Sequence, residues 1–107
     1  MDPDMADKKR VLVVADDLGL GVRIRDVLMG IHDVLVVSWP QLALDLLKLG
    51  GRWDTILCEP RPKGLAPKEF VYAVSRIAAD QAERIVVLDP RPSPSGILRS
   101  VEATTGS

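Results

Sequence analysis

This sequence contains little cysteine and no excess of basic residues. Its 107 residues include one cysteine, Cys58, which excludes an internal disulfide and argues against a metal site built from cysteines. Lys and Arg number 14 against 15 Asp and Glu, and the pI is near 5.7. Because no basic stripe is present to neutralise phosphates, the composition argues against binding of nucleic acid or of an anionic membrane surface.

Long apolar runs are also missing. No stretch approaches the roughly 20 apolar residues that a membrane-spanning helix needs, and the acidic start Met1–Asp4 does not look like a signal peptide. We therefore expect a cytoplasmic protein. With 47% hydrophobic residues, the chain is long enough for one small domain with one core and too short for two.

Four β-branched or leucine-rich runs alternate with helical patterns. The runs are residues 11–14, 34–37, 55–58 and 85–88, and helical spacing follows the first three, beginning near Leu18, Pro40 and Pro67. Strands that alternate with helices in this way predict an α/β fold with a doubly wound parallel sheet. The strand order that we expect is 2-1-3-4, with right-handed crossovers.

The two ends of the chain lack this pattern. Residues 1–9 are polar and predict a disordered N-terminal arm, so the domain spans 10–89. Residues 90–107 form a Pro-rich tail with room for one short helix at 95–103, which could lie over part of the sheet. The tail is too short for a further strand flanked by two helices. The fourth strand should therefore be an edge of the sheet, with part of a sheet face bare.

The segment Arg10–Asp17 resembles the first strand and acid pair of a response-regulator receiver domain. Residues 53–60 resemble its third strand, which ends at the phosphorylation site, and residues 64–70 resemble the loop and helix start that follow. The resemblance implies a flavodoxin-like fold. It also implies a site at the carboxyl ends of the strands that binds Mg²⁺ through acids and accepts a phosphoryl group on an aspartate. In the family, a hydroxyl side chain donates a hydrogen bond to the phosphoryl group and a lysine pairs with its charge, and these contacts signal that the group is present.

The sequence departs from this family pattern in four ways. Ala15 stands where the family has its first acid, so Asp16 matches the second acid and Asp17 is an extra one. Glu59 replaces the acceptor aspartate, Asp89 replaces the hydroxyl residue, and no lysine follows Lys68. A carboxylate displaced by about 1 Å can lose roughly 100-fold in rate. The resemblance is therefore to a shortened pseudo-receiver, which we expect not to be phosphorylated.

The acids at the strand ends should lie close together and repel one another. They could spread into solvent, raise a pKa, pair with Arg61 or Arg91, or hold Mg²⁺ or Ca²⁺ weakly through Asp16, Asp17 and Glu59. Glu59 itself could be a solvated loop acid or could imitate the charge of a phosphorylated aspartate. No other cofactor is expected. His32, the only histidine, falls in a turn and should lie at the surface, and Cys58 should be an inert core residue.

The bare sheet surface predicts association with protein, and a homodimer is its simplest form. We expect contact through the fourth strand and the tail, or through helix faces. The two tryptophans could be core residues or anchors for a partner. The candidate interface residues are Trp39, Trp53, Ile85, Val86, Val87, Leu88, Ile97, Leu98 and Val101.

These observations favour a non-enzymatic adaptor or scaffold of bacterial-type, two-component signal transduction that presents surfaces to a protein partner. One alternative is an atypical phosphoacceptor that uses Glu59, Asp16 or Asp54 at an altered Mg²⁺-dependent site. Another is a regulatory fragment of a longer signalling protein, with the tail as its linker. The partner and its pathway are not encoded in any motif of the sequence.

Overall fold

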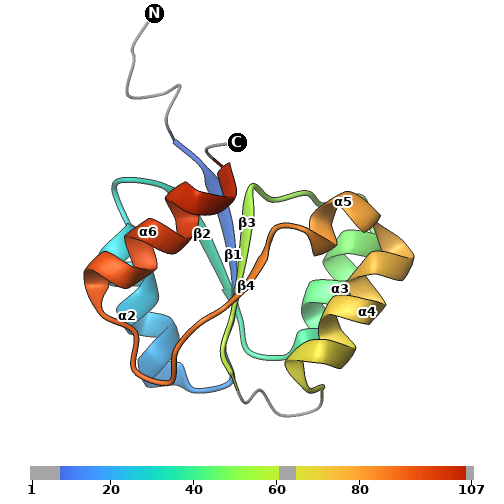
Figure 1. Cartoon of the computed structure of the whole chain (residues 1–107), viewed down its shortest axis with the longest axis horizontal. Coiled ribbons are helices and arrows are strands. Elements are labelled where there is room, and N and C mark those ends of the chain that lie inside the picture. The colour runs from blue at the N-terminus through green and yellow to red at the C-terminus, as the bar shows by residue number, and fades with distance from the viewer. Residues whose placement is uncertain (1–7, 61–64, 106–107) are drawn as a thin grey trace, which may run out of the picture.

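The chain folds as three layers, with a parallel sheet between two layers of helices (Figure 1). The computed structural model describes residues 8–60 and 65–105. The strands are β1 (Arg10–Val14), β2 (Asp33–Val37), β3 (Thr55–Cys58) and β4 (Ile85–Val87). The helices are α2 (Leu18–Leu28), α3 (Pro40–Lys48), α4 (Pro67–Ile77), α5 (Ala79–Ala82) and α6 (Pro94–Thr105).

The sheet has the order β2-β1-β3-β4, and all three strand pairs are parallel. Leu12 on β1 lies opposite Leu35 on one side and Ile56 on the other. The predicted fold class and strand order are therefore confirmed. A parallel sheet of this kind has its strand ends on one edge, which is where ligands bind in open α/β folds.

Local signals in the sequence set the helix ends. Asp17 caps α2, and Gly30 follows the helix with a positive φ of 88°. Pro40 opens α3 at its first turn, where a missing N–H costs nothing. Gly50 follows α3 with a φ of 97°, a backbone conformation that residues with a Cβ rarely adopt. These stops keep the helices short enough to return the chain to the next strand.

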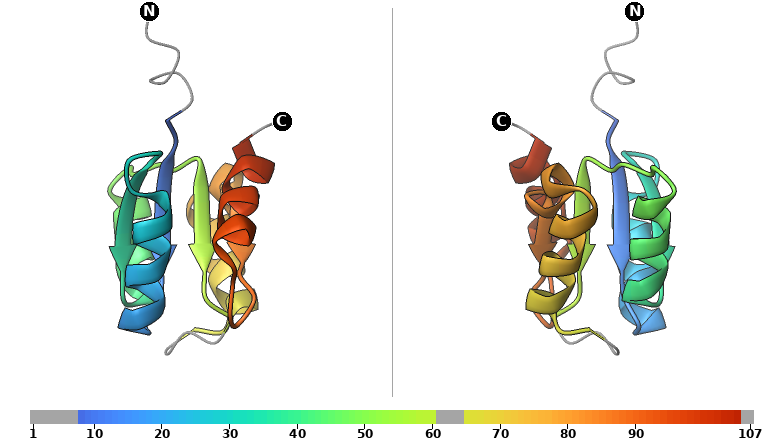
Figure 2. Two further views of the ribbon diagram at one scale, coloured as in Figure 1. Left: turned by 90° about the vertical axis from the view of Figure 1, so that its left-hand side faces the viewer. Right: turned by 90° about the vertical axis from the view of Figure 1, so that its right-hand side faces the viewer.

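The core lies on both faces of the sheet because the inner strands are buried on both sides. Helices α2 and α6 cover one face, and α3, α4 and α5 lie on the other (Figures 1 and 2). Residues alternate between the two faces along β1, with Val11 and Val13 toward α2 and Leu12 and Val14 toward α3. The uninterrupted apolar run of β1 is explained by this double burial.

The tail corrects one prediction. Helix α6 runs from Pro94 to Thr105, longer than the expected 95–103, and it packs against α2 and β3. Ile97 and Val101 are fully buried in the core beneath it. The sheet face that was expected to be partly bare is thus covered by the chain's own C-terminal helix, the tail helix that could lie over it. The short helix α5 was not expected, and β4 ends one residue earlier than predicted.

The N-terminal arm, expected at residues 1–9, lies outside the described residues except for Lys8 and Lys9. Lys8 pairs with Asp33 at 3.3 Å, and the Lys9 N–H donates to Nδ1 of His32 at 3.1 Å. Lys8 and Lys9 therefore contact the folded domain and belong to it, not to the arm. Across residues 8–60 and 65–105, the helices are too short and too polar for any of them to traverse a bilayer.

Candidate functional site

The predicted site lies at the carboxyl ends of β1 and β3. Ala15 and Asp16 follow β1 directly, and Glu59 follows β3. The Glu59 N–H donates to the Val14 carbonyl at 3.1 Å, which continues the ladder between these strands past the last paired residue. The backbone therefore brings Asp16 and Glu59 side by side, as the family resemblance implied.

The Glu59 side chain turns back toward β1. It is only 8% exposed, and its Oε1 accepts a hydrogen bond from the Asp16 backbone N–H. The extra methylene of glutamate lets the carboxylate reach this N–H. Glu59 therefore fastens the loop between β1 and α2 to the end of β3. The possibility that Glu59 is a solvated loop acid is wrong, because the carboxylate is buried and hydrogen-bonded.

Asp17 serves its own helix. Its Oδ1 accepts hydrogen bonds from the N–H groups of Gly19 at 2.9 Å and Leu20 at 3.2 Å, which makes it the N-cap of α2. Ala15 is buried, and its N–H donates to the Val37 carbonyl at 3.0 Å. The position where the family has its first acid thus holds a methyl group that packs in the core.

Asp89 follows the end of β4. The Leu88 N–H donates to the Cys58 carbonyl at 2.9 Å, and the next residue, Asp89, is exposed. Arg91 is exposed as well, and Arg61 lies outside the described residues, so pairing of the acids with Arg61 stays a prediction.

A metal centre does not fit these residues. In the part of the chain that the structure describes, no three Asp, Glu, His or Cys side chains form a group that could hold a metal ion. Asp17 is used as a helix cap and Glu59 accepts a backbone N–H, so Asp16, Asp17 and Glu59 do not converge as a set of ligands. A hard cation would need several such oxygens at once. We therefore derive no chemistry through Mg²⁺ or Ca²⁺ here.

Asp54, the other candidate phosphoacceptor, lies at the opposite end of β3. Its carboxylate accepts the Arg10 N–H at 2.8 Å, at the start of β1. Its neighbour Trp53 is buried, with the Arg10 guanidinium 5.5 Å from the ring centre. Asp54 is thus far along the strand from the predicted site and serves to join two strand starts.

Several candidate interface residues are core residues instead. Because α6 closes over one face of the sheet and α3 and α4 over the other, four side chains have almost no exposed surface, and they are Trp53, Leu88, Ile97 and Val101. Ile85, Val86 and Leu98 are partly buried. Trp39 and Val87 remain exposed. Four of the nine candidate interface residues are therefore unavailable to a partner in this fold.

Sequence reasoning missed two polar residues. His32 was expected at the surface but is buried, and burial, helped by the charge of Lys9, lowers its pKa. Gln81 on α5 is buried and holds both backbone groups of Trp53, accepting its N–H at 2.8 Å and donating to its carbonyl at 3.0 Å. Neither residue stands within an apolar run, since Asp33 follows His32 and Asp80 precedes Gln81, so the sequence carried no local signal for the burial of either. Cys58 is buried as predicted, and burial raises the pKa of its thiol to about 11.

No protein-family description and no curated protein sequence matches the chain. Solved structures do match. The receiver domain of a sensor histidine kinase from Pseudomonas aeruginosa, with magnesium in its active-site cleft, is similar with a TM-score of 0.80 at 16% identity, over 94% of this chain and 99% of that one. The chemotaxis response regulator CheY4 of Vibrio cholerae has a TM-score of 0.65 at 21% identity, over 94% and 82%.

A fusion protein that contains the trimeric coiled coil of yeast Spc42 also matches, with a TM-score of 0.70 at 19% identity, and the chain covers 63% of its length. At such identities the likeness establishes the fold. Together with the sheet order 2-1-3-4, it shows that this chain has the fold of the response-regulator receiver domains.

Proposed function

We propose that the chain is a pseudo-receiver, a receiver-fold module of cytoplasmic signal transduction that binds protein partners without control by phosphorylation. The observation that carries this proposal is the burial and the hydrogen bonding of the Glu59 side chain. Its carboxylate is buried and accepts the Asp16 N–H, so it occupies the place of an acceptor but is already used as a structural link.

The surroundings of Glu59 support the same reading. Phosphoryl transfer to a carboxylate needs an accessible oxygen and a cation that neutralises the incoming charge. Ala15 supplies no oxygen ligand, and Asp17 is engaged at the start of α2. The bond between Glu59 and Asp16 also joins the β1–α2 loop to the end of β3. This link forms without a phosphoryl group, which suits an adaptor that presents its surface without phosphoryl control.

Incubation with Mg²⁺ and a small acyl-phosphate donor, followed by intact-mass analysis, tests the proposal. The expected result is that the wild-type chain gains no phosphoryl mass under conditions in which an ordinary receiver domain becomes modified. Glu59→Asp is the matched variant, because it restores the shorter acid while leaving Ala15 in place, and we expect it to stay unmodified too. A stable phosphoryl adduct on the wild type would contradict the proposal and favour the atypical phosphoacceptor. Peptide mapping would then distinguish Glu59 from Asp16 and Asp54.

A further inference from the structure

The unit formed by α2 and β2 carries most of the exposed apolar surface. Ten large apolar side chains are exposed in the described part of the chain, and six of them lie between residues 18 and 39. Together these six expose on the order of 600 Å², which is at the upper end of the range for the largest apolar patch of a typical monomer. They are Leu18, Val22, Met29, Ile31, Leu35 and Trp39.

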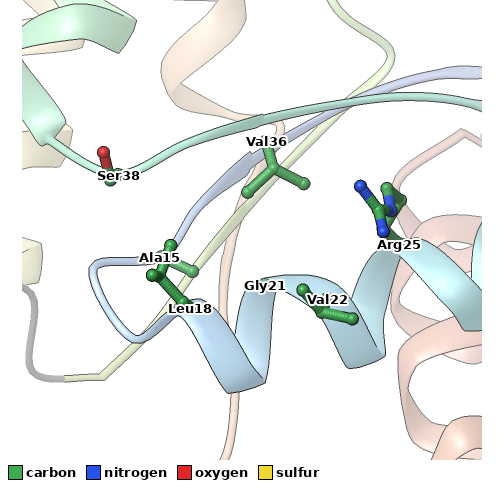
Figure 3. A pocket seen from close by; sticks show the side chains of 7 residues that line it. All are labelled: Ala15, Leu18, Gly21, Val22, Arg25, Val36 and Ser38. Carbon is green, nitrogen blue, oxygen red and sulfur yellow. The ribbon is translucent and has the colours of Figure 1, made fainter.

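A shallow hollow of about 190 Å³ lies where α2 meets β2 (Figure 3). Its walls are mostly apolar and include Leu18, Val22 and Val36, with Arg25 at one end. Gly21 lets the helix approach the strand closely, since a Cβ there would stand 3.1 Å from Val36 Cγ1. The apolar surface of the helix therefore continues onto Val36, which lies on the α2 face of the strand, whereas Leu35 lies on the other face.

Strand β2 is an edge of the sheet, and its outer backbone groups are available for pairing. The Asp33 N–H donates to the Lys9 carbonyl and the Val37 carbonyl accepts from Ala15, so these two residues pair toward β1. Because the direction alternates along a parallel strand, the N–H and C=O groups of Val34 and Val36 point away from β1. The strand contains no proline, lysine or bulge, which are the usual protections of an edge.

The exposed residues are arranged symmetrically about Leu35. An antiparallel pair with a two-fold axis at Leu35 places Val34 opposite Val36 of a second copy, so that each such pair exchanges both backbone hydrogen bonds. Leu35, which is 44% exposed, then faces Leu35 of that copy. Ile31, 50% exposed, and Trp39, 53% exposed, lie two residues beyond the two ends of β2, at equal separations from Leu35 along the chain. A strand that is complementary to itself fits a second copy of its own chain better than an unrelated partner.

We propose that two copies of the chain associate through antiparallel pairing of their β2 edges, which joins the two sheets into one. The apolar area of the α2–β2 unit approaches the roughly 800 Å² per partner of a standard stable interface, before backbone contacts are added. The opposite edge is a poorer candidate, because β4 has three residues and Val87 is its one well-exposed apolar side chain. This places the contact away from the β4 and tail surface, which was one of the two contact surfaces that the sequence suggested, the other being helix faces.

Molar mass measured by light scattering over a concentration series tests the proposal with a matched pair of variants. Leu35 and Val87 are each 44% exposed and each lie on an edge strand. Leu35→Lys sets two like charges face to face across the axis and should raise the dissociation constant by about 100-fold or more. Val87→Lys makes the same change on β4 and should leave the dimer intact. Circular dichroism confirms that both variants are folded.

A second variant keeps the test decisive if Leu35→Lys does not fold. In the proposed register the Cα atoms at position 35 are about 4.5 Å apart, within the range of a disulfide. Leu35→Cys should form a cross-linked dimer under mild oxidation, whereas Val87→Cys should not, and the native Cys58 is buried. Three results would each overturn the proposal. The wild type could be monomeric at every concentration, Val87→Lys could dissociate the dimer while Leu35→Lys does not, or Leu35→Cys could fail to cross-link the dimer.

Discussion

The Glu59 carboxylate illustrates how one methylene changes the role of a position. It reaches the Asp16 backbone N–H at the end of the neighbouring strand and accepts a hydrogen bond there. We expect Glu59→Ala to lower the free energy of unfolding by about 1–3 kcal/mol, the usual cost of a lost buried hydrogen bond. Glu59→Gln keeps an acceptor oxygen at the same reach and should cost less. Urea denaturation measures both values.

The control for this comparison is Asp89→Ala. Asp89 is an acid at the end of a neighbouring strand, but it is exposed. Its removal should change stability by no more than about 0.5 kcal/mol, as is usual for surface positions. Equal losses for Glu59→Ala and Asp89→Ala would mean that the Glu59 bond contributes nothing particular to the fold.

His32 should make stability depend on pH. Burial and Lys9 lower its pKa in the folded state, against weaker opposite effects of Glu102, Asp33 and Asp54. The unfolded chain therefore takes up the proton first as pH falls. The contribution of His32 to stability is present above about pH 6.5, the ordinary pKa of histidine, and is lost as pH falls from there toward the lowered pKa.

The test replaces His32 with asparagine, which can still accept the Lys9 N–H but does not titrate in this range. Thermal unfolding between pH 7 and about 5 should show a smaller loss of stability for His32→Asn than for the wild type. Parallel curves for the two proteins would show that His32 is not the group responsible.

At the scale of elements, α6 is the piece that completes the domain. Ile97 and Val101 belong to the same core cluster as Val11, Val13 and Leu57, so the helix closes one face of the sheet. We expect Ile97→Ala to cost about 2–5 kcal/mol, because it removes buried methyl groups and leaves a cavity. Arg99→Ala changes an exposed residue of the same helix and should be nearly neutral. If both variants unfold at the same denaturant concentration, α6 is not an integral part of the core.

Helix α6 and the elements before it also differ in how well the sequence predicts them. The strands could be identified because each apolar run is buried on both faces, and Pro40 and Pro67 mark helix starts that the structure confirms. Pro94 is the same signal at α6, but three apolar residues in a Pro-rich tail do not indicate what they cover. Which sheet face a helix covers is a property of the tertiary structure. Here it depends on the space beside α2, and a local sequence pattern does not contain that information.

For the whole molecule, the resemblance led to the right fold and to Asp16 and Glu59 lying side by side, but not to the side-chain contacts that these residues make. The positions of Ala15, Asp16 and Glu59 followed from the strand order. That Glu59 would turn inward, and that Asp17 would cap its helix, depended on side-chain directions that spacing does not fix. The exposed apolar surface was misplaced for a related reason. Its location depends on which surfaces α6 covers, and α6 packs on α2, β3 and β4.

The different settings of the two tryptophans have a practical consequence. Trp53 is buried against Arg10 at the start of the sheet, whereas Trp39 is exposed just beyond β2. In fluorescence, the emission of Trp53 therefore reports the loss of the core, and that of Trp39 reports what happens at the β2 edge. The chain thus carries two intrinsic optical probes, one for unfolding and one for association. Replacing either tryptophan with phenylalanine would let the two events be followed separately in one sample.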